Sequence, residues 1–134
     1  MADFSWLPPL IKLSDCSGDT IYYVDQLYKK FKDDLVSQTN LALFGKAVRV
    51  SPKLDVDNRH ERFWHTITDP HNPSTSDIKP FRAERISWIK ALIENVGKDG
   101  ICVYDRVKDR ETRLHIFGPE LNYLIIFTET KKAY

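Results

Sequence analysis

The sequence has little of what marks a secreted, membrane-bound or cysteine-rich protein. It contains two cysteines, Cys16 and Cys102, and no Cys-x-x-Cys pair, so no disulfide framework is expected. Its apolar runs are too short to cross a bilayer, and its first residues lack the basic and apolar regions of a signal peptide. These absences predict a cytoplasmic protein with no membrane partner and two free thiols, with Cys102 in an apolar run of the core.

The chain also lacks an excess of one charge and the glycine-rich motifs of nucleotide-binding proteins. Lys and Arg number 20 against 19 Asp and Glu, and the net charge of +1 excludes a protein that coats nucleic acid by bulk positive charge. No phosphate-binding glycine loop or Rossmann fingerprint is present, so we expect no cofactor. Residues 46–90 nevertheless hold nine basic and six acidic residues, which favours a local anion-binding surface.

The length suits one domain over residues 1–134, because two domains of half that size would each lack a sufficient core. Residues 1–18, with Pro8-Pro9, predict an irregular lead-in. Residues 69–80 contain three prolines among Asn, Ser and Thr, and predict a long loop. The aromatic segment at 59–68 fits either a strand or a short helix.

Two spacings of apolar residues occur in the rest of the chain. Helical spacing predicts helices at 20–36 and 81–96, while period-two alternation predicts a short strand at 46–51. The last part of the chain predicts a meander of three consecutive strands, at 101–107, 112–117 and 122–128. This order predicts an α+β fold with the helices packed on one face of an antiparallel sheet.

The first candidate for chemistry is a pair of histidines, His60 and His65. Two histidines four residues apart on a helix can hold one metal, but these are five apart and diverge on a helix or a strand, so we expect no metal site. Histidine titrates near neutral pH and can act as a general acid or base. The alternative is structural, with His60 exposed beside charged neighbours and His65 half-packed beside aromatic residues.

The second candidate is a set of cations at the start of the helix expected at 81–96. Arg82 and Arg85 are three apart and share a helical face, with Lys79 just before them. Guanidinium groups held in this way can bind phosphate oxygens in pairs. An ordinary solvated helix face with paired arginines would have the same pattern.

The third candidate lies on the second strand of the expected meander. If Leu114 and Ile116 face the core, Arg113, His115 and Phe117 face the other side of the sheet. A cation, a histidine and an aromatic ring on an open sheet face can hold a nucleotide. Such a row is also common on a merely solvated sheet face.

The order of these segments resembles small proteins of phages, plasmids and bacterial genomes, and is similar to the phage-type nucleases of the barnase–EndoU–colicin–RelE superfamily. Five segments carry the resemblance: Tyr23–Asp34, Phe63–Thr68, Asp77 with Arg82–Trp88, Glu111–Arg113, and Tyr123–Ile126. Members of this group continue past the final Tyr into a further strand, which Lys131–Tyr134 would only enter. We therefore expect an exposed C-terminal sheet edge that a second copy of the chain can cover.

The resemblance implies metal-free cleavage of RNA, in which the ribose 2′-OH attacks the adjacent phosphate. His65 or His60 would be the general base or acid, Arg82 and Arg85 would hold the phosphate, and Arg113, His115 and Lys79 would bind substrate. The alternative is a non-catalytic accessory protein that binds RNA or a host protein through the same surface. A toxin with an antitoxin partner is a third interpretation.

Overall fold

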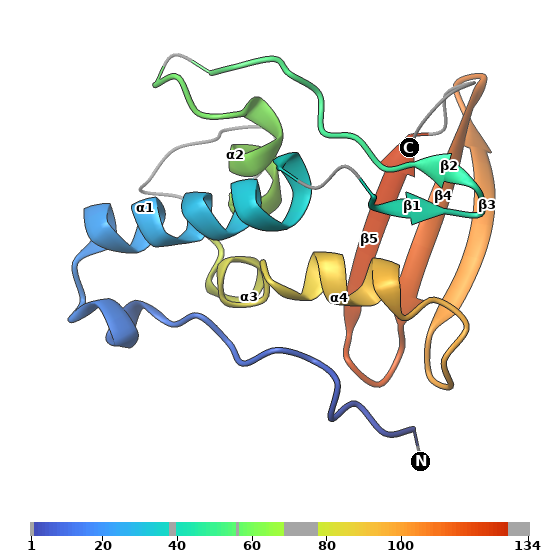
Figure 1. Cartoon of the computed structure of the whole chain (residues 1–134), viewed down its shortest axis with the longest axis horizontal. Helices are drawn as coiled ribbons and strands as arrows, with labels where there is room; N and C mark the ends of the chain where they lie inside the picture. The colour runs from blue at the N-terminus through green and yellow to red at the C-terminus, as the bar shows by residue number, and fades with distance from the viewer. Residues whose placement is uncertain (1, 38–39, 56, 69–77, 129–134) are drawn as a thin grey trace. The chain divides into compact units, whose positions relative to one another are not determined.

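The computed structural model describes residues 2–37, 40–55, 57–68 and 78–128, which form a mixed structure of helices and antiparallel sheets (Figure 1). This confirms the α+β class. The chain divides into two compact units. The helical unit comprises Pro8–Gln38 and Val50–Trp88, and the sheet unit comprises Met1–Leu7, Thr39–Arg49 and Ile89–Tyr134. A single domain over the whole chain stays a prediction.

The helical unit is built on α1 (Thr20–Phe31), which follows the 3-10 turn η1 (Leu13–Cys16) and continues into the π-turn η2 (Lys32–Val36). The Asp19 side chain caps α1 by accepting a hydrogen bond from the backbone N–H of Tyr22 at 3.1 Å. The helix expected at 20–36 is therefore confirmed. The buried side chains of α1 follow the apolar spacing of the sequence: Tyr23, Val24, Leu27 and Phe31.

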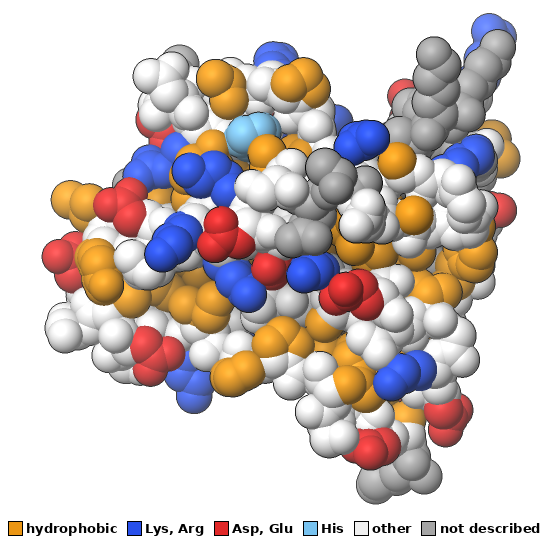
Figure 2. Space-filling model, viewed as in Figure 1, with side chains coloured by type: hydrophobic (Ala, Val, Ile, Leu, Met, Phe, Trp, Pro, Cys, Tyr) orange, Lys and Arg blue, Asp and Glu red, His pale blue; other side chains and the backbone are white. Residues whose placement is uncertain are grey.

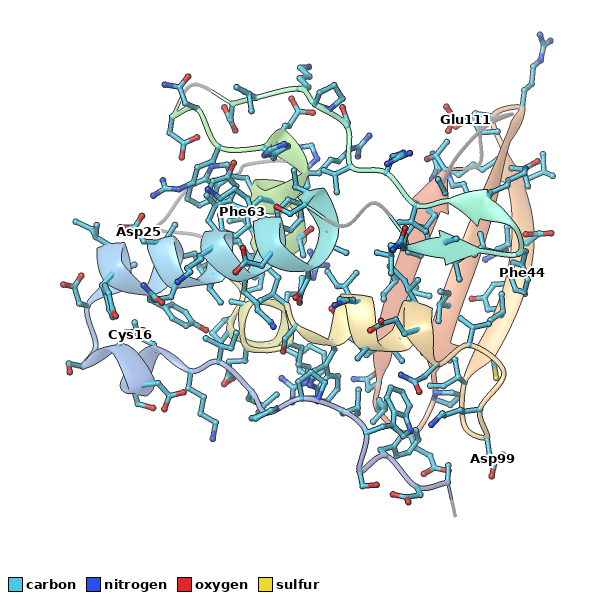
Figure 3. The ribbon with its side chains drawn as sticks, viewed as in Figure 1. Cys16, Asp25, Phe44, Phe63, Asp99 and Glu111 are labelled. Atoms are coloured by element: carbon cyan, nitrogen blue, oxygen red, sulfur yellow. The ribbon has the colours of Figure 1, made fainter. Side chains whose placement is uncertain are left out.

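The aromatic segment after the polar turn forms a helix, α2 (Glu61–Ile67), and not a strand. Phe63 is fully buried, and its ring centroid lies 4.9 Å from that of Tyr28 and 5.6 Å from that of Phe31 on α1 (Phe63 is labelled in Figure 3). These contacts join α1 and α2. Truncating a ring at such a position, Phe63→Ala, costs about 3–5 kcal/mol of stability.

The single helix expected at 81–96 is wrong, because the chain forms α3 (Pro80–Glu84) and α4 (Trp88–Glu94) with a turn between them. Within the helical unit, Trp88 Nε1 donates to the carbonyl of Pro8 at 2.9 Å, and the N–H of Ile11 donates to the carbonyl of Glu84 at 2.9 Å. The lead-in segment thus forms hydrogen bonds with residues on both sides of the turn between α3 and α4. The local spacing of apolar residues cannot reveal such long-range hydrogen bonds.

The sheet unit contains a small hairpin of β1 (Ala42–Leu43) and β2 (Lys46–Ala47). Phe44 (labelled in Figure 3) and Gly45 form its turn with φ of 49° and 82°, as a tight hairpin of this hand requires. The strand expected at 46–51 is therefore shorter than predicted. Its partner β1 was missed, because two residues are too few to show an alternating pattern.

The three-strand meander is confirmed, with β3 (Cys102–Lys108), β4 (Glu111–Gly118) and β5 (Tyr123–Thr128) in the order β3-β4-β5 (Figure 1). Leu114 and Ile116 are buried on one face of β4, as expected. Cys102 does not join them, because its register partner Phe117 lies on the opposite face, and the thiol side chain is exposed. The core prediction for Cys102 is wrong, and Cys16 is the buried cysteine.

Candidate functional site

The residues predicted to carry chemistry lie in both units. His60, His65, Lys79, Arg82 and Arg85 belong to the helical unit, on or next to α2 and α3. The two predicted substrate-binding residues of β4 belong to the sheet unit. Each group is therefore described by itself.

His60 is the histidine with the most defined surroundings. It precedes α2 and is half-buried, and its Nδ1 lies 2.7 Å from the hydroxyl oxygen of Tyr28 on α1. The same hydroxyl oxygen accepts a hydrogen bond from the backbone N–H of His60 at 3.3 Å. Two contacts between the same pair of residues therefore fix the imidazole against α1. The expectation of an exposed His60 is wrong, whereas its charged neighbours Arg59 and Glu61 are present as expected.

The hydrogen bond to Tyr28 limits how the His60 ring can carry its proton. When the Tyr28 hydroxyl donates to Nδ1, the neutral ring holds its proton on Nε2; when Nδ1–H donates to Tyr28, Nε2 is an acceptor. In both arrangements Nδ1 is occupied. Nε2 is then the ring nitrogen that can take or give a proton to another molecule, as in sites where a third group orients a catalytic base.

Arg59 lies beside this pair between two carboxylates. Its Nη1 donates to Asp57 at 2.9 Å, and its Nη2 forms an ion pair with Asp25 on α1 (Asp25 is labelled in Figure 3). Trp64 Nε1 also donates to Asp57, at 2.9 Å. The guanidinium carbon lies 5.8 Å from the ring centroid of Tyr28. Asp25, Tyr28, Asp57, Arg59, His60 and Trp64 are together called the Tyr28–His60 cluster.

The pKa values of this cluster reflect its ion pair. Burial acts to raise the pKa of Asp57, but hydrogen bonds from Arg59 and Trp64 and the charge of Arg59 outweigh it and leave that pKa below its usual value. Burial acts to lower the pKa of Arg59, but the carboxylates of Asp57 and Asp25 outweigh burial and leave that pKa above its usual value. Both groups are therefore held in their charged forms.

Two further cations lie close to the cluster. Lys32 Nζ is 5.0 Å above the ring centroid of Tyr28, and Lys53 Nζ is 3.1 Å from the carboxylate of Glu61, the residue after His60. The side chain of Lys53 is 70% exposed. An anion at this surface can therefore meet cations from two segments. Cations and carboxylates are also interspersed on the face of the molecule that Figure 2 shows.

His65 has a different place in the same helix. It lies in the last turn of α2 and is half-buried, and its ring makes no hydrogen bond to another residue in the described part of the chain. The two predicted histidines are thus not equivalent. His60 is oriented by a neighbouring side chain, whereas His65 has no such orienting group among residues 2–37, 40–55, 57–68 and 78–128.

The cations predicted to bind phosphate form hydrogen bonds with backbone carbonyl groups of the protein itself. Arg82 Nη1 donates to the carbonyl of Thr68, just after α2, at 3.1 Å. Arg85 Nη1 donates to the carbonyl of Phe81 at 3.1 Å, and its guanidinium carbon lies 3.8 Å from the ring centroid of Phe81. The exposed Lys79 contributes its backbone N–H to the carbonyl of Ile67. Each of these residues has a structural role, while Asp77 of the same motif lies outside the described residues.

The face of β4 opposite Leu114 and Ile116 holds Arg113 and His115, as expected. The His115 ring stacks on Tyr104 of β3, with centroids 4.9 Å apart and planes 12° apart, and Ile126 of β5 is its register partner on the other side. His115 itself is 7% exposed, whereas Tyr104 is 40% and Ile126 is 50% exposed. We call this surface the outer sheet face; it comprises Tyr104, Arg106, Arg113, His115, Phe117, Leu124 and Ile126.

Arg113 keeps one end of this face polar. Its Nη2 lies 3.4 Å from the carboxylate of Glu111, and Arg106 is its register partner on β3. Cations therefore stand at one end of the stacked rings. β5 is an edge strand in the described sheet, and the predicted turn into a further strand at Lys131–Tyr134 lies outside the described residues.

The sequence did not indicate the partners of His60. Tyr28 fits the apolar stripe of α1, and Arg59 and Asp57 are two of many charged residues in the segment 46–90. They meet His60 only because α1 and α2 pack through Phe63. A tyrosine in an apolar stripe is the one signal that points to such a polar contact, and Tyr23 in the same stripe carries it too.

The described residues contain no group of three or more His, Cys, Asp or Glu side chains that could hold a metal ion. Among the same residues, no helix has the length and apolar character required to cross a membrane. No family model, no curated protein and no solved structure matches this chain.

Proposed function

We propose that the protein is a metal-independent ribonuclease in which His60 exchanges protons with the substrate. The observation that carries the proposal is the contact between Tyr28 and His60, which occupies Nδ1 and leaves Nε2 for the substrate. The resemblance to phage-type nucleases points to the same reaction. A cytoplasmic location, where RNA is the abundant substrate, belongs to the same proposal.

The proposed reaction needs one proton acceptor, one proton donor and positive charge. Nε2 of His60 takes the proton of the ribose 2′-OH as the 2′ oxygen bonds to phosphorus. The bond from phosphorus to the 5′ oxygen then breaks, and the protonated ring returns the proton to that leaving oxygen. The products are a 2′,3′-cyclic phosphate and a 5′-OH, with no oxidant or metal required.

The cations beside the cluster would stabilise the charge that develops on the phosphate. Lys53 is exposed and next to the segment that carries His60, and Lys32 lies over the Tyr28 ring. Removing one well-placed donor of this kind typically lowers a rate by about 100-fold or more. Arg82, Arg85 and Lys79 are further candidates for phosphate binding, as the resemblance implies.

The test is incubation of the pure protein with total RNA in EDTA. The wild type should degrade the RNA, His60→Gln should be inactive at equal concentration, and His65→Gln should keep its activity, because His60 has an orienting side chain and His65 has none among the described residues. If His65→Gln is the inactive variant, His65 is the catalytic histidine. Intact RNA with the wild-type protein contradicts the enzyme proposal altogether.

A second candidate is a non-catalytic accessory protein that binds RNA, a host protein or an antitoxin. The observation that favours it is the outer sheet face, where Tyr104 and Ile126 are exposed beside Arg106 and Arg113. Aromatic rings and cations on an open sheet suit single-stranded RNA. Retarded but uncleaved RNA in a gel would support this candidate, and a homodimer through β5 would appear as a doubled mass in solution.

A further inference from the structure

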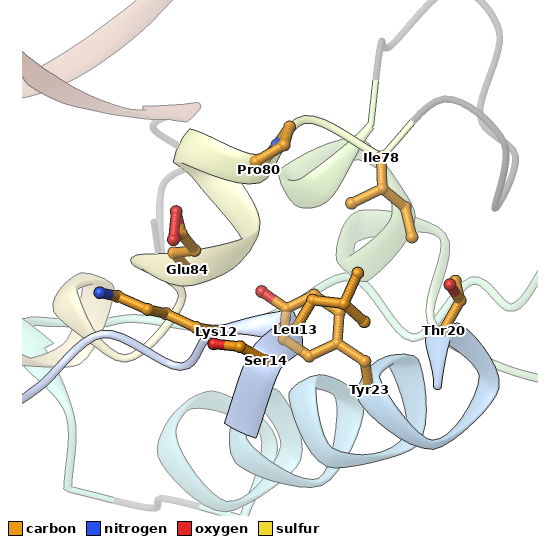
Figure 4. Close-up of a pocket in the computed structure, with 8 residues that line it drawn as sticks. All are labelled: Lys12, Leu13, Ser14, Thr20, Tyr23, Ile78, Pro80 and Glu84. Atoms are coloured by element: carbon orange, nitrogen blue, oxygen red, sulfur yellow. The ribbon is translucent and has the colours of Figure 1, made fainter. Parts of the chain in front are cut away.

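The helical unit contains a pocket that the proposed ribonuclease reaction does not use. Its cavity volume is about 440 Å³, within the range of small-molecule sites (Figure 4). The pocket lies between η1, the start of α1 and the segment that leads into α3. Its lining residues are Lys12, Leu13, Ser14, Thr20, Tyr23, Ile78, Pro80 and Glu84.

The pocket has an apolar part, beside the polar side chains of Lys12, Ser14, Thr20 and Glu84. Leu13, Ile78 and Pro80 supply aliphatic surface, and the Tyr23 ring is 4% exposed. The Tyr23 hydroxyl donates to the carbonyl of Ile11 at 2.6 Å, so it is already satisfied by the protein. An occupant would therefore gain apolar contact from this part of the pocket.

Two lining side chains carry charge, and neither has an ion-pair partner among the described residues. Glu84 is half-buried on α3, whereas Lys12 is exposed before η1. Figure 4 shows both at the pocket, on separate segments. A half-buried carboxylate beside apolar surface is the group whose interaction with a ligand is least weakened by water.

The carboxylate of Glu84 acts on the Tyr23 hydroxyl at this pocket. Burial is the main cause that raises the pKa of Tyr23 to about 12, and the charges of Glu84, Cys16 and Asp15, in that order, raise it further. Among the lining residues Lys12 and Glu84 carry one charge of each sign, and Glu84 is the more buried of the two. Because water weakens the charge of the exposed Lys12 more than that of the half-buried Glu84, the pocket favours a cationic occupant over an anionic one.

We propose that this pocket binds a small organic amine, with its apolar body against Leu13, Tyr23 and Ile78 and its ammonium group on the Glu84 carboxylate. A charge-assisted hydrogen bond of this kind is stronger than a neutral one. The proposal is independent of RNA cleavage, because the pocket residues and the Tyr28–His60 cluster have no residue in common. An RNA-cleavage assay therefore does not decide it.

The experiment uses three indole probes that differ in charge: tryptamine, tryptophol and indole-3-acetate. Each is titrated into the full ¹⁵N-labelled chain, and amide shifts are followed at Leu13, Tyr23, Ile78 and Glu84. Tryptamine should shift these signals saturably, with at least about tenfold higher affinity than the neutral tryptophol. Indole-3-acetate should bind most weakly of the three.

Variants separate the charge of Glu84 from the shape of the pocket. Glu84→Gln should reduce the preference for tryptamine over tryptophol to about twofold or less. The matched control Glu94→Gln, on an exposed residue of α4 that does not line the pocket, should keep the wild-type preference. Lys12→Met should bind tryptamine as tightly as the wild type or more tightly, because it removes the competing cation.

Three results would overturn the proposal. They are equal affinities of tryptamine and tryptophol for the wild-type chain, an unchanged preference in Glu84→Gln, and shifts confined to residues outside the pocket. Should Glu84→Gln fail to fold, the comparison of the three probes on the wild type decides the question by itself.

Discussion

The described residues contain two contacts between a tyrosine and a histidine, one in each unit, and they differ in kind. Tyr28 and His60 meet through a hydrogen bond of 2.7 Å, with their rings 6.0 Å apart and tilted by 43°. Tyr104 and His115 meet face to face, with their rings 4.9 Å apart and 12° from parallel. The first contact occupies a ring nitrogen, whereas the second covers the ring faces.

The two tyrosine–histidine pairs therefore suit different functions, although their residue types are the same. A hydrogen bond at Nδ1 orients the His60 ring and leaves Nε2 for proton exchange, as a general acid or base requires. A stack leaves the outer side of Tyr104 as apolar surface at the edge of the sheet, which suits contact with a base or another ring. We therefore expect proton transfer at His60 and binding at Tyr104.

The largest expected effect separates the two histidines in catalysis. His60→Gln should lower the rate of RNA cleavage by at least about 100-fold, because it removes the proton-transfer group. His115→Gln, the matched change in the stacked pair, should change the rate by less than about threefold, since its ring is buried and stacked on Tyr104. Single-turnover cleavage of a labelled oligonucleotide measures both, and equal losses would remove the distinction between the pairs.

The next effect concerns binding of single-stranded RNA to the outer sheet face. Tyr104→Ala should weaken binding by about tenfold, because each stacked base contributes about 1–3 kcal/mol. Tyr104→Phe retains the ring and should bind as the wild type does. Fluorescence anisotropy at two salt concentrations measures the effect, and unchanged affinity in Tyr104→Ala would exclude this face as an RNA surface.

A smaller effect distinguishes the two tyrosine hydroxyls in stability. Tyr28→Phe should lower the free energy of unfolding by about 1 kcal/mol, because it removes the hydrogen bonds with Nδ1 and the backbone N–H of His60. Tyr104→Phe should change it by less than about 0.5 kcal/mol, since ring stacking is retained. Urea denaturation followed by circular dichroism gives both values, and similar losses would contradict the contrast.

The smallest expected effect is the response of the Tyr28–His60 cluster to acid. The pKa of Asp57 in the folded chain lies below its ordinary value of 3.8, so its contribution is present above that value and is lost as the pH falls below it. Asp57→Asn should therefore lose less stability than the wild type over this acid range. Trp64→Phe removes one donor and should fall between the two. Parallel stability curves for all three proteins would show that the ion pair does not stabilise the fold.

Sequence patterns predicted those elements whose burial repeats at regular intervals. The stripe of α1 was confirmed because this helix buries one face along its length. The strands β3, β4 and β5 were also confirmed, although most residues of β3 are exposed. The turn between α3 and α4 was missed because it depends on Trp88 and the carbonyl of Pro8, 80 residues apart. The predicted burial of Cys102 was wrong because this residue lies on the sheet face opposite Leu114 and Ile116, and neighbouring strand residues alternate between the two faces.

The candidate site shows the same limit. His60 was found because histidine is rare and chemically distinctive. Tyr28, which orients it, lies 32 residues earlier in the chain, and the ion pair between Arg59 and Asp25 spans 34 residues. No local pattern links such partners, since they meet only through the packing of α1 on α2.

The most direct test of the account is the chemistry of the cut ends. The wild-type protein is incubated in EDTA with an RNA oligonucleotide and with a DNA oligonucleotide of the same sequence, and the fragments are identified by mass. The account predicts RNA fragments that end in a 2′,3′-cyclic phosphate, with intact DNA, because the 2′-OH is the nucleophile. Intact RNA, cleaved DNA or fragments with 5′-phosphate ends would contradict it.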